Sequence, residues 1–156
     1  YRDLIPCCTG MIQREVAQRM AAGPGSRTYG ILSVLLQAWY SVEYLFTVDE
    51  HVFCPPPMVK SAVIRLTRNE VSSLPCNEVL FRRVVKTTFN QRRKTLRNNI
   101  RPLLAQIDNE QREKGMQPKD HTEWLAQELF QKRPEQLSVQ DFISLTLSLQ
   151  QECGLE

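Results

Sequence analysis

The spacing of apolar residues at the start of the chain predicts helices packed beside strands. The run TGMIQ is followed by REVAQRMAA, in which Val16 and Met20 stand four residues apart, so we expect a strand and then a helix. Residues 31–39 (ILSVLLQAW) are apolar on nearly every side, as in a helix that packs on a sheet. Residues 40–48 alternate between apolar and polar positions, which is typical of a strand. The apolar face of this strand would carry Tyr40, Val42, Tyr44, Phe46 and Val48.

A second strand is expected after the proline-containing connection DEHVFCPPP. The segment MVKSAVIRLT is apolar and β-branched, and we expect it to pair antiparallel with residues 40–48. The next stretch, NEVSSLPCN, is polar and contains Pro75, which indicates a linker. We therefore predict a first domain over residues 1–67, a linker over residues 68–77 and a second domain over residues 78–156.

The second domain has the periodicity of helices throughout. Two successive helices are predicted from stripes that comprise Phe81, Val84, Val85 and Phe89, and then Leu96, Ile100, Leu103 and Leu104. We expect a break near Asn90, a residue type that favours the N-cap of the second helix. A short helix is predicted around Trp124, and the capping box from Ser138 to Asp141 predicts a helix from Val139 to Gln151. The chain is thus predicted to be an α+β fragment in the order β-α-α-β-β, followed by a small all-α domain.

Composition narrows the class of protein. The chain is 42% hydrophobic and 24% charged, as is typical of soluble globular proteins, and no apolar run approaches the roughly 18 residues that cross a bilayer. The five cysteines form no C-x-x-C pair, so we predict reduced thiols in a cytosolic protein. His51 and His121 have no zinc-like spacing, and we expect exposed or capping roles for them and no metal site. The chain begins without Met or a signal pattern, which indicates a piece of a longer protein.

Positive charge is concentrated in one segment. The net charge is +3, but residues 67–101 carry nine Lys and Arg against two acids, whereas residues 102–156 carry five against ten. Such a run is often only a solvated helix face, but a block without compensating acids attracts phosphate, and we predict nucleic-acid binding. The candidate RNA-binding residues are Arg82, Arg83, Lys86, Arg92, Arg93, Lys94, Arg97 and Arg101.

Catalytic motifs are missing from the sequence, and one loop is unusual. The chain contains no glycine-rich cofactor loop, P-loop, zinc motif or nucleophile elbow. In the stretch VFCPPPMV, the prolines Pro55, Pro56 and Pro57 stiffen the backbone that carries Phe53. Phe53 would either stack on a base lifted out of RNA or pack into the core, with the prolines only ending a strand, and the residues leave both alternatives open.

Five segments in a fixed order connect these features. Taken together, MIQREVAQRM, PGSRTYGILSVLLQ, VFCPPPMVKSAVIRLT, FNQRRKTLRNN and RPEQLSVQDF resemble the bacterial small-subunit rRNA adenine dimethyltransferase (dimethyladenosine transferase) family over residues 10–142. The resemblance implies an enzyme that transfers methyl groups from S-adenosylmethionine to two adjacent adenosines of small-subunit rRNA during ribosome assembly. It also implies a Rossmann-like methyltransferase domain before the helical domain, of which residues 1–67 would be the last part.

The resemblance further implies roles for particular residues. Phe53, with Pro55, Pro56 and Pro57, would border the pocket of the target adenine. The residues that would lie toward the rRNA are Arg92, Arg93, Lys94 and Arg97. The family's glycine-rich cofactor loop, its acidic ribose ligand and its N-L-P-Y motif have no counterpart in this sequence. We therefore expect a cytoplasmic C-terminal portion of the enzyme, without catalytic or cofactor-binding residues and inactive alone.

Two interpretations stay open, an enzyme fragment and a non-enzymatic RNA-binding or ribosome-assembly module. In both, the partner is small-subunit rRNA or the pre-ribosomal small subunit, and no membrane is involved. If the sheet is truncated, the strand near Gly10 to Gln13 lacks a neighbour. We then expect self-association through its exposed edge, or partial disorder of the first domain.

Overall fold

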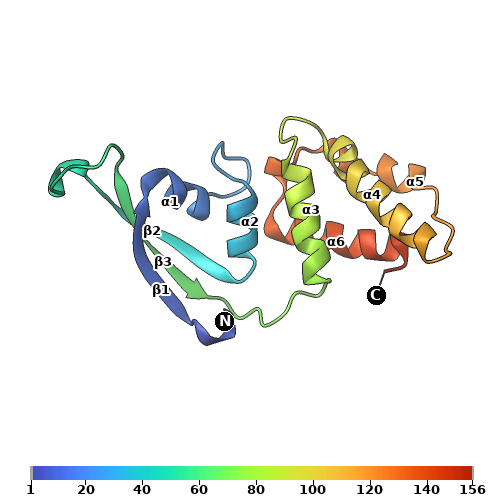
Figure 1. The fold of residues 1–156 in the computed structure, drawn as a ribbon, viewed down its shortest axis with the longest axis horizontal. Helices are drawn as coiled ribbons and strands as arrows, with labels where there is room; N and C mark the ends of the chain where they lie inside the picture. The colour runs from blue at the N-terminus through green and yellow to red at the C-terminus, as the bar shows by residue number, and fades with distance from the viewer. Residues whose placement is uncertain (1, 156) are drawn as a thin grey trace. The chain divides into compact units, whose positions relative to one another are not determined.

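A computed structural model describes residues 2–155 (Figure 1). The chain folds as two compact units, and the division between them falls between Ser73 and Leu74. The first unit contains the sheet and the second is helical (Figure 1). The predicted α+β class and the order β-α-α-β-β are confirmed, whereas the predicted domain limits stay a prediction. No helix in the described part of the chain is long and apolar enough to cross a membrane.

The sheet of the first unit has three strands in the order β1, β3, β2, and both pairings are antiparallel. β1 spans Cys7–Gln13, β2 spans Tyr40–Val48 and β3 spans Ser61–Arg68. The apolar, β-branched sequence of β3 suits the central place, and its residues Ala62 and Ile64 are buried. Among the strands of the described residues, β1 pairs with β3 alone and therefore forms one edge of the sheet. A single turn of 3-10 helix, η1 (Arg2–Leu4), precedes it.

Helix α1 (Arg14–Ala21) lies against one face of this sheet. Ala17 is fully buried with Ala62 and Ile64, and Met20 packs against the same group. The small side chain of Ala17 allows the helix to approach the strands closely. The predicted strand-then-helix order at the start of the chain is confirmed.

Helix α2 (Ile31–Gln37) is tied to the end of α1. The side-chain amide of Gln37 donates to the carbonyl of Met20 at 2.9 Å and to the carbonyl of Ala22 at 2.8 Å. Carbonyls at a helix C-terminus lack partners within the helix, and Gln37 supplies them. The helix predicted over residues 31–39 is confirmed, although it ends two residues earlier.

The predicted alternation of β2 fails at Phe46. Tyr44 lies opposite Ile64, but Phe46 lies opposite Val63, so the strand contains a β-bulge between Tyr44 and Phe46. An extra residue reverses the face on which all later side chains of the strand lie. The prediction that Phe46 shares a face with Tyr44 is therefore wrong, and Phe46 is 55% exposed.

The second unit is a small bundle of helices, as predicted. Its α-helices within the described residues are α3 (Glu78–Phe89), α4 (Leu96–Glu113), α5 (Thr122–Ala126) and α6 (Val139–Cys153). Two 3-10 helices, η3 (Glu128–Gln131) and η4 (Pro134–Gln136), lie between α5 and α6. The predicted apolar stripes form the core, in which Phe81, Ile100 and Phe142 are fully buried. Burial of each such side chain stabilises the fold by about 1.5–3 kcal/mol.

The helix ends match the sequence in one case and differ in another. The capping box before α6 is confirmed, because Ser138 Oγ accepts from Asp141 N at 3.1 Å and Asp141 Oδ2 accepts from Ser138 N at 2.8 Å. The prediction for Asn90 is wrong, since Asn90 is the C-cap of α3 and α4 begins only after Thr95. A compact turn over residues 90–95 separates the two helices.

Candidate nucleic-acid interface

The basic segment predicted from the sequence lies largely in this turn. Residues 90–95, called the basic turn below, connect α3 to α4. Arg93 and Lys94 are exposed, whereas Arg92 is half buried. The Nε of Arg92 lies 3.5 Å from Oε2 of Glu135 in η4, so this guanidinium is already held by an acid of the same unit. The turn therefore presents two exposed cations, Arg93 and Lys94, to a ligand.

The N-terminus of α4 adjoins the basic turn and favours an anion. A helix N-terminus carries a partial positive charge, although in α4 the amides of Leu96 and Asn98 already donate to the carbonyls of Lys132 and Thr95. The first turn of α4 contains no acidic residue, and Thr95 makes no side-chain cap hydrogen bond. The same turn contains Arg97, whose Nε is buried without a hydrogen-bond partner among the described residues. A ligand does not reach this shielded atom without a movement of the Arg97 side chain, so Arg97 contributes mainly its positive charge.

Two further basic residues lie beside the N-terminus of α4, and the sequence had not singled them out. The amide of Leu96, the first residue of α4, donates to the carbonyl of Lys132 at 2.8 Å. This bond brings Lys132 and Arg133, both exposed, next to the helix N-terminus. Both lie in the acidic segment 102–156, far from the basic run, so only the fold indicates their role.

The other predicted cations lie elsewhere in the second unit. Nη2 of Arg83 donates to Oε1 of Glu110 at 3.0 Å, near the C-terminal end of α4. Arg82 is next to Arg83 and is therefore also far along α3 from the basic turn. Lys86 lies one turn before the end of α3, and Arg101 lies in the second turn of α4. The structure thus brings together part of the predicted set and leaves Arg82 and Arg83 apart from it.

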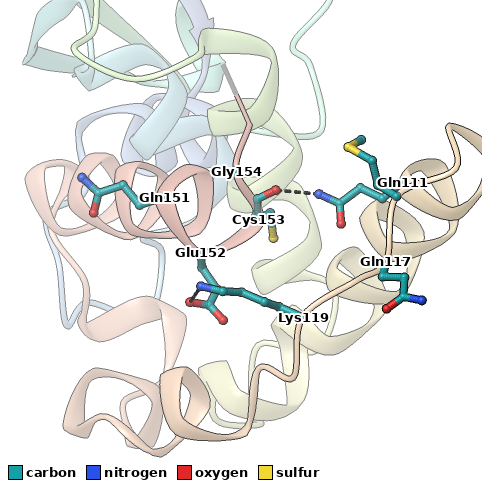
Figure 2. A pocket seen from close by; sticks show the side chains of 8 residues that line it. Gln111, Gln117, Lys119, Gln151, Glu152, Cys153 and Gly154 are labelled. Carbon is teal, nitrogen blue, oxygen red and sulfur yellow. Dashed lines mark hydrogen bonds and ion pairs between the residues drawn. The ribbon is translucent and has the colours of Figure 1, made fainter.

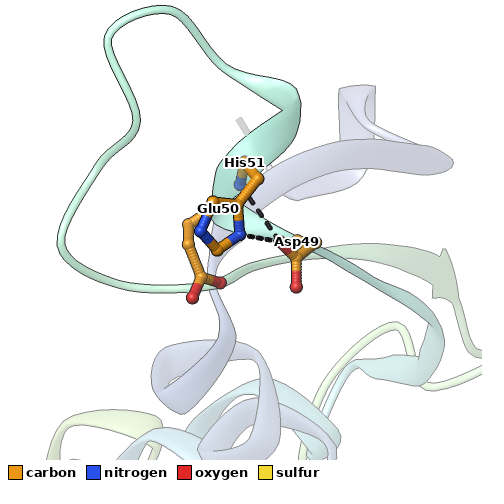
Figure 3. A group of neighbouring side chains, drawn as sticks. All are labelled: Asp49, Glu50 and His51. Carbon is orange, nitrogen blue, oxygen red and sulfur yellow. Dashed lines mark hydrogen bonds and ion pairs between the residues drawn. The ribbon is translucent and has the colours of Figure 1, made fainter.

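In the first unit, the proline-containing connection between β2 and β3 is clamped at its base. Asp49 caps the 3-10 helix η2 (Glu50–Val52), and its carboxylate accepts from His51 N at 3.1 Å and from His51 Nδ1 at 2.7 Å (Figure 3). Lys60, just before β3, donates to the same carboxylate at 3.1 Å. The hydrogen bonds from His51 and Lys60 hold the pKa of Asp49 well below its usual range, and Asp49 in turn raises the pKa of Lys60. Asp49 therefore joins the two ends of the connection.

The same residues have the composition of a metal-binding group. One ligand atom from each of Asp49, Glu50 and His51 lies within 4.8 Å of the others (Figure 3). The ammonium group of Lys60, however, is 3.1 Å from Asp49 and 3.8 Å from Glu50. A cation of the protein itself already pairs with both carboxylates, so we interpret the group as the clamp of the connection.

The remainder of the connection exposes apolar residues, and in Figure 1 it extends beyond the ends of β2 and β3. Phe53 is half buried, so it is not part of the buried core. Pro55, Pro56 and Pro57 are exposed, and Met58 is fully exposed. The prolines do not end a strand, because β2 already ends at Val48. Exposed apolar residues on a clamped loop are typical of a surface that meets a partner, and the role of Phe53 itself stays a prediction.

The described residues do not fit S-adenosylmethionine. In open α/β sheets, such ligands lie at the carboxyl ends of parallel strands, beside a glycine-rich loop. Here the strands are antiparallel, and β1 passes from Gln13 directly into α1 at Arg14. A hollow of about 320 Å³ beside this junction is lined mainly by polar and charged side chains, among them Arg14, Glu15 and Lys60. No step of a methyl transfer can be assigned to these residues.

The C-terminal part of the second unit contains a buried ionic cluster that sequence reasoning missed. His121 is 9% exposed, and its Nδ1 lies 2.9 Å from Glu152 while its Nε2 lies 3.1 Å from Asp108. Burial alone would lower the pKa of His121, but the hydrogen bonds to Glu152 and Asp108 outweigh burial and raise it. The predicted exposed role is wrong for this histidine. His121 stands at the N-cap of α5, as the capping alternative has it, but its side chain makes no cap hydrogen bond. No sequence signal could have found the cluster, because its members come from three separate segments.

A pocket of about 270 Å³ lies beside this cluster (Figure 2). Gln111 donates to the carbonyl of Cys153 at 2.5 Å, and Lys119 Nζ lies 3.9 Å from Glu152. Burial, with the nearby carboxylates of Asp108 and Glu152, raises the pKa of Cys153 to about 11. The thiol is therefore protonated at neutral pH and unsuited to act as a nucleophile. We interpret these contacts as fastening the end of α6.

Comparison with known proteins gives consistent matches over most of the chain. The family model for ribosomal RNA adenine dimethylase matches residues 5–139. Ribosomal RNA small subunit methyltransferase A from Phocaeicola vulgatus is 66% identical over 146 residues, which are 94% of this chain and 47% of that protein. The protein of the same name from Porphyromonas gingivalis is 57% identical over 151 residues, which are 96% of this chain and 53% of that protein. The chain spans about half the length of these curated relatives.

Two of the solved structures that match this chain are also named as transferases. A dimethyladenosine transferase from Plasmodium falciparum matches with a TM-score of 0.81 at 25% identity, covering 98% of this chain and 61% of that chain. The 23S rRNA methyltransferase ErmE matches with a TM-score of 0.52 at 20% identity, covering 91% of this chain and 55% of that chain. The second match is a likeness of fold alone.

Proposed function

Because this chain belongs to the ribosomal RNA adenine dimethylase family, we propose that it is the C-terminal portion of an S-adenosylmethionine-dependent enzyme. The enzyme would dimethylate two adjacent adenosines of small-subunit rRNA during ribosome assembly. The first unit would then be the last part of a Rossmann-like methyltransferase sheet, and the second unit would bind the rRNA. The two bacterial relatives are named small-subunit rRNA methyltransferases, and bacterial ribosomes assemble in the cytoplasm, where we expect the protein to act.

The observation that carries this proposal is the gathering of cations at the N-terminus of α4. We call this group the basic surface, and it comprises Arg93, Lys94, Arg97, Lys132 and Arg133. It combines exposed charge, the positive end of a helix and the guanidinium charge of the half-buried Arg97. Contacts of these kinds to phosphate dominate the affinity of proteins for nucleic acids. The basic surface is therefore suited to the backbone of rRNA.

Salt-dependent binding tests the proposal. Affinity for an rRNA fragment that carries the target adenosines should fall linearly with salt on logarithmic axes, and the double change Arg93→Ala and Lys94→Ala should reduce the slope by about two. The matched control, Arg112→Ala with Lys114→Ala, removes the same charge from exposed positions at the other end of α4. An unchanged slope in the first variant, or an equal loss in the control, would contradict the proposal.

We further propose that this chain alone neither binds S-adenosylmethionine nor transfers methyl groups. The support is the charged hollow beside β1 and the match to about half of each curated relative. Incubation of the purified chain with labelled S-adenosylmethionine and rRNA should transfer no label above background. Methylation by the purified chain would refute this part of the proposal.

A non-enzymatic RNA-binding module is the second candidate, and the poor fit to the cofactor favours it. Phe53 distinguishes the two candidates in a protein of full length. If the connection positions the target base, Phe53→Ala should sharply reduce methylation while rRNA affinity stays nearly constant. Val52→Ala changes an exposed apolar neighbour, 68% exposed, and serves as the control. Full activity of the Phe53 variant would favour the module.

We also propose that the isolated chain associates with itself through the edge of the first unit. Met11 and Phe46 both lie opposite Val63, so the three form one apolar row across β1, β3 and β2. Met11 is 51% and Phe46 55% exposed, and within the described part of the chain β1 has a strand neighbour on one side only. An open edge beside an exposed apolar row favours pairing with another chain.

A further inference from the structure

Asn99, on α4, fastens the basic turn from within. Its side chain is 3% exposed, and its Nδ2 donates to the carbonyls of Thr88 at 2.8 Å, Gln91 at 3.2 Å and Lys94 at 3.2 Å. An amide nitrogen is a donor and an amide oxygen an acceptor, so three carbonyl neighbours identify this end as the NH₂ group. One buried side chain therefore holds the end of α3 and two points of the turn.

These three carbonyls lie where α3 ends and the chain turns into α4, and backbone carbonyls at such a point lack hydrogen-bond donors within a helix. Thr88 is in the last turn of α3, where carbonyls lack partners within the helix. The carbonyl of Gln91 also accepts from Lys94 N at 2.8 Å, so the turn is closed on itself and Asn99 attaches it to α4. Oδ1 of Asn99 has no hydrogen-bond partner among the described residues. The hydrogen bonds from Nδ2 therefore offset the cost of burying the Asn99 amide, because a buried polar group is costly unless it is bonded.

We propose that Asn99 is a positioning residue of the rRNA-binding surface, and this inference rests on the function proposed above. By holding the carbonyls of Gln91 and Lys94, Asn99 fixes the backbone that carries Arg93 and Lys94 before RNA arrives. A mobile turn would lose backbone entropy at the moment of binding, and a turn that is already ordered avoids that loss. Asn99 thereby strengthens binding of the phosphate backbone without touching it.

The substitution Asn99→Leu tests this inference, because it keeps a side chain of similar size and removes both donors. We expect a roughly tenfold loss of rRNA affinity at fixed salt, since the two hydrogen bonds that hold the turn at Gln91 and Lys94 are lost together with the one to Thr88 in α3. We also expect faster hydrogen exchange of the Lys94 amide in the absence of RNA, because its acceptor, the carbonyl of Gln91, is no longer held by Asn99.

The matched control is Thr146→Val on α6. Thr146 is fully buried and its Oγ1 donates to Phe142 O at 2.8 Å, so this variant also loses a buried hydrogen bond. Both variants should lower the thermal midpoint of the second unit, but only Asn99→Leu should weaken rRNA binding and deprotect the turn. If the two variants bind rRNA equally well when compared below their midpoints, Asn99 is merely structural and the inference is overturned.

Two further measurements keep the outcome decisive. In the unsubstituted chain, the amide of Lys94, which donates to the carbonyl of Gln91, should be protected from exchange before RNA is added. Free exchange of this amide would overturn the inference even if Asn99→Leu fails to fold. The Arg93→Ala and Lys94→Ala variant distinguishes the role of Asn99 from the rRNA-binding function of the basic surface. If that variant loses affinity while Asn99→Leu does not, only the role of Asn99 fails, whereas an unchanged affinity in the charge variant refutes the proposed function itself.

Discussion

At the scale of single residues, the cations of the basic run differ in what lies beside them. Arg83 is 3.0 Å from Glu110 and Arg92 is 3.5 Å from Glu135, whereas Arg93 and Lys94 are exposed. The positive block could be predicted from the sequence, but this division could not. Both acids lie in the segment 102–156, which the sequence shows only as a separate acidic region. A cation that an acid already holds contributes less to phosphate binding than an unpaired one.

Glu135 should therefore restrain the contribution of Arg92 to RNA binding. We expect Glu135→Gln to raise rRNA affinity a few-fold and to increase the salt slope by up to about one, because Arg92 is released from its carboxylate. The control Glu110→Gln releases Arg83 at the far end of α4 and should leave the slope unchanged. Equal slopes in the Glu135 and Glu110 variants would show that Arg92 does not reach the RNA.

His121 should make the stability of the second unit depend on pH. Although burial lowers its pKa, the hydrogen bonds to Glu152 and Asp108 raise it above the ordinary value of 6.5 in the folded chain. A group whose pKa is raised by folding stabilises the fold fully below its unfolded pKa, and this stabilisation is lost as the pH rises through the folded pKa. Lys119, 3.9 Å from Glu152, is the other cation beside the cluster.

The measurement is urea unfolding at several pH values, followed on the amide signals of α6. From pH 6 upward, the free energy of unfolding should fall more steeply in the unsubstituted chain than in His121→Gln. The control is His51→Gln, whose side chain is 81% exposed in the first unit. If the pH dependence of the unfolding free energy is the same in His121→Gln, it arises from groups other than His121.

At the scale of elements, local signals predicted the helices well and the irregular points poorly. The capping box at Ser138 could be read from the sequence because both partners lie within four residues. The start of α4 could not, because Asn90 and Thr95 are both acceptable cap residues and only the packing of the turn decides between them. The bulge in β2 has no local signal either, since the apolar alternation continues through Phe46 while the backbone does not.

The capping box allows a test of what a local signal contributes. Ser138→Ala removes the acceptor for Asp141 N and should cost about 1 kcal/mol of unfolding free energy in the second unit. Ser144→Ala makes the same change at an exposed interior position of α6, where alanine is the better helix former, and should not destabilise. Urea denaturation of both variants measures the difference. Equal stabilities would mean that tertiary packing alone fixes the start of α6.

At the scale of the whole chain, the family could be predicted because five segments keep residue types and spacing in order. The binding surface could be predicted only in part, because Lys132 and Arg133 reach the N-terminus of α4 through one backbone hydrogen bond from Leu96. Asn99 was visible in the sequence only as one of several polar residues near the run. Its role follows from burial and from three carbonyl partners, which no pattern of residue types encodes.

The open edge of the first unit leads to a prediction about the chain as a molecule in solution. Light scattering should show a mean mass that rises with concentration, because β1 and the apolar row of Met11, Val63 and Phe46 can pair with another copy. Met11→Lys places a charge in that row and should reduce association, as charged residues protect natural sheet edges. Met116→Lys makes the same change at a position of nearly equal exposure, 49% against 51%, in the helical unit and should have no effect. A constant monomer mass at every concentration, with uniform amide protection in both units, would contradict this prediction. It would show that the first unit is stable without a further strand at its edge.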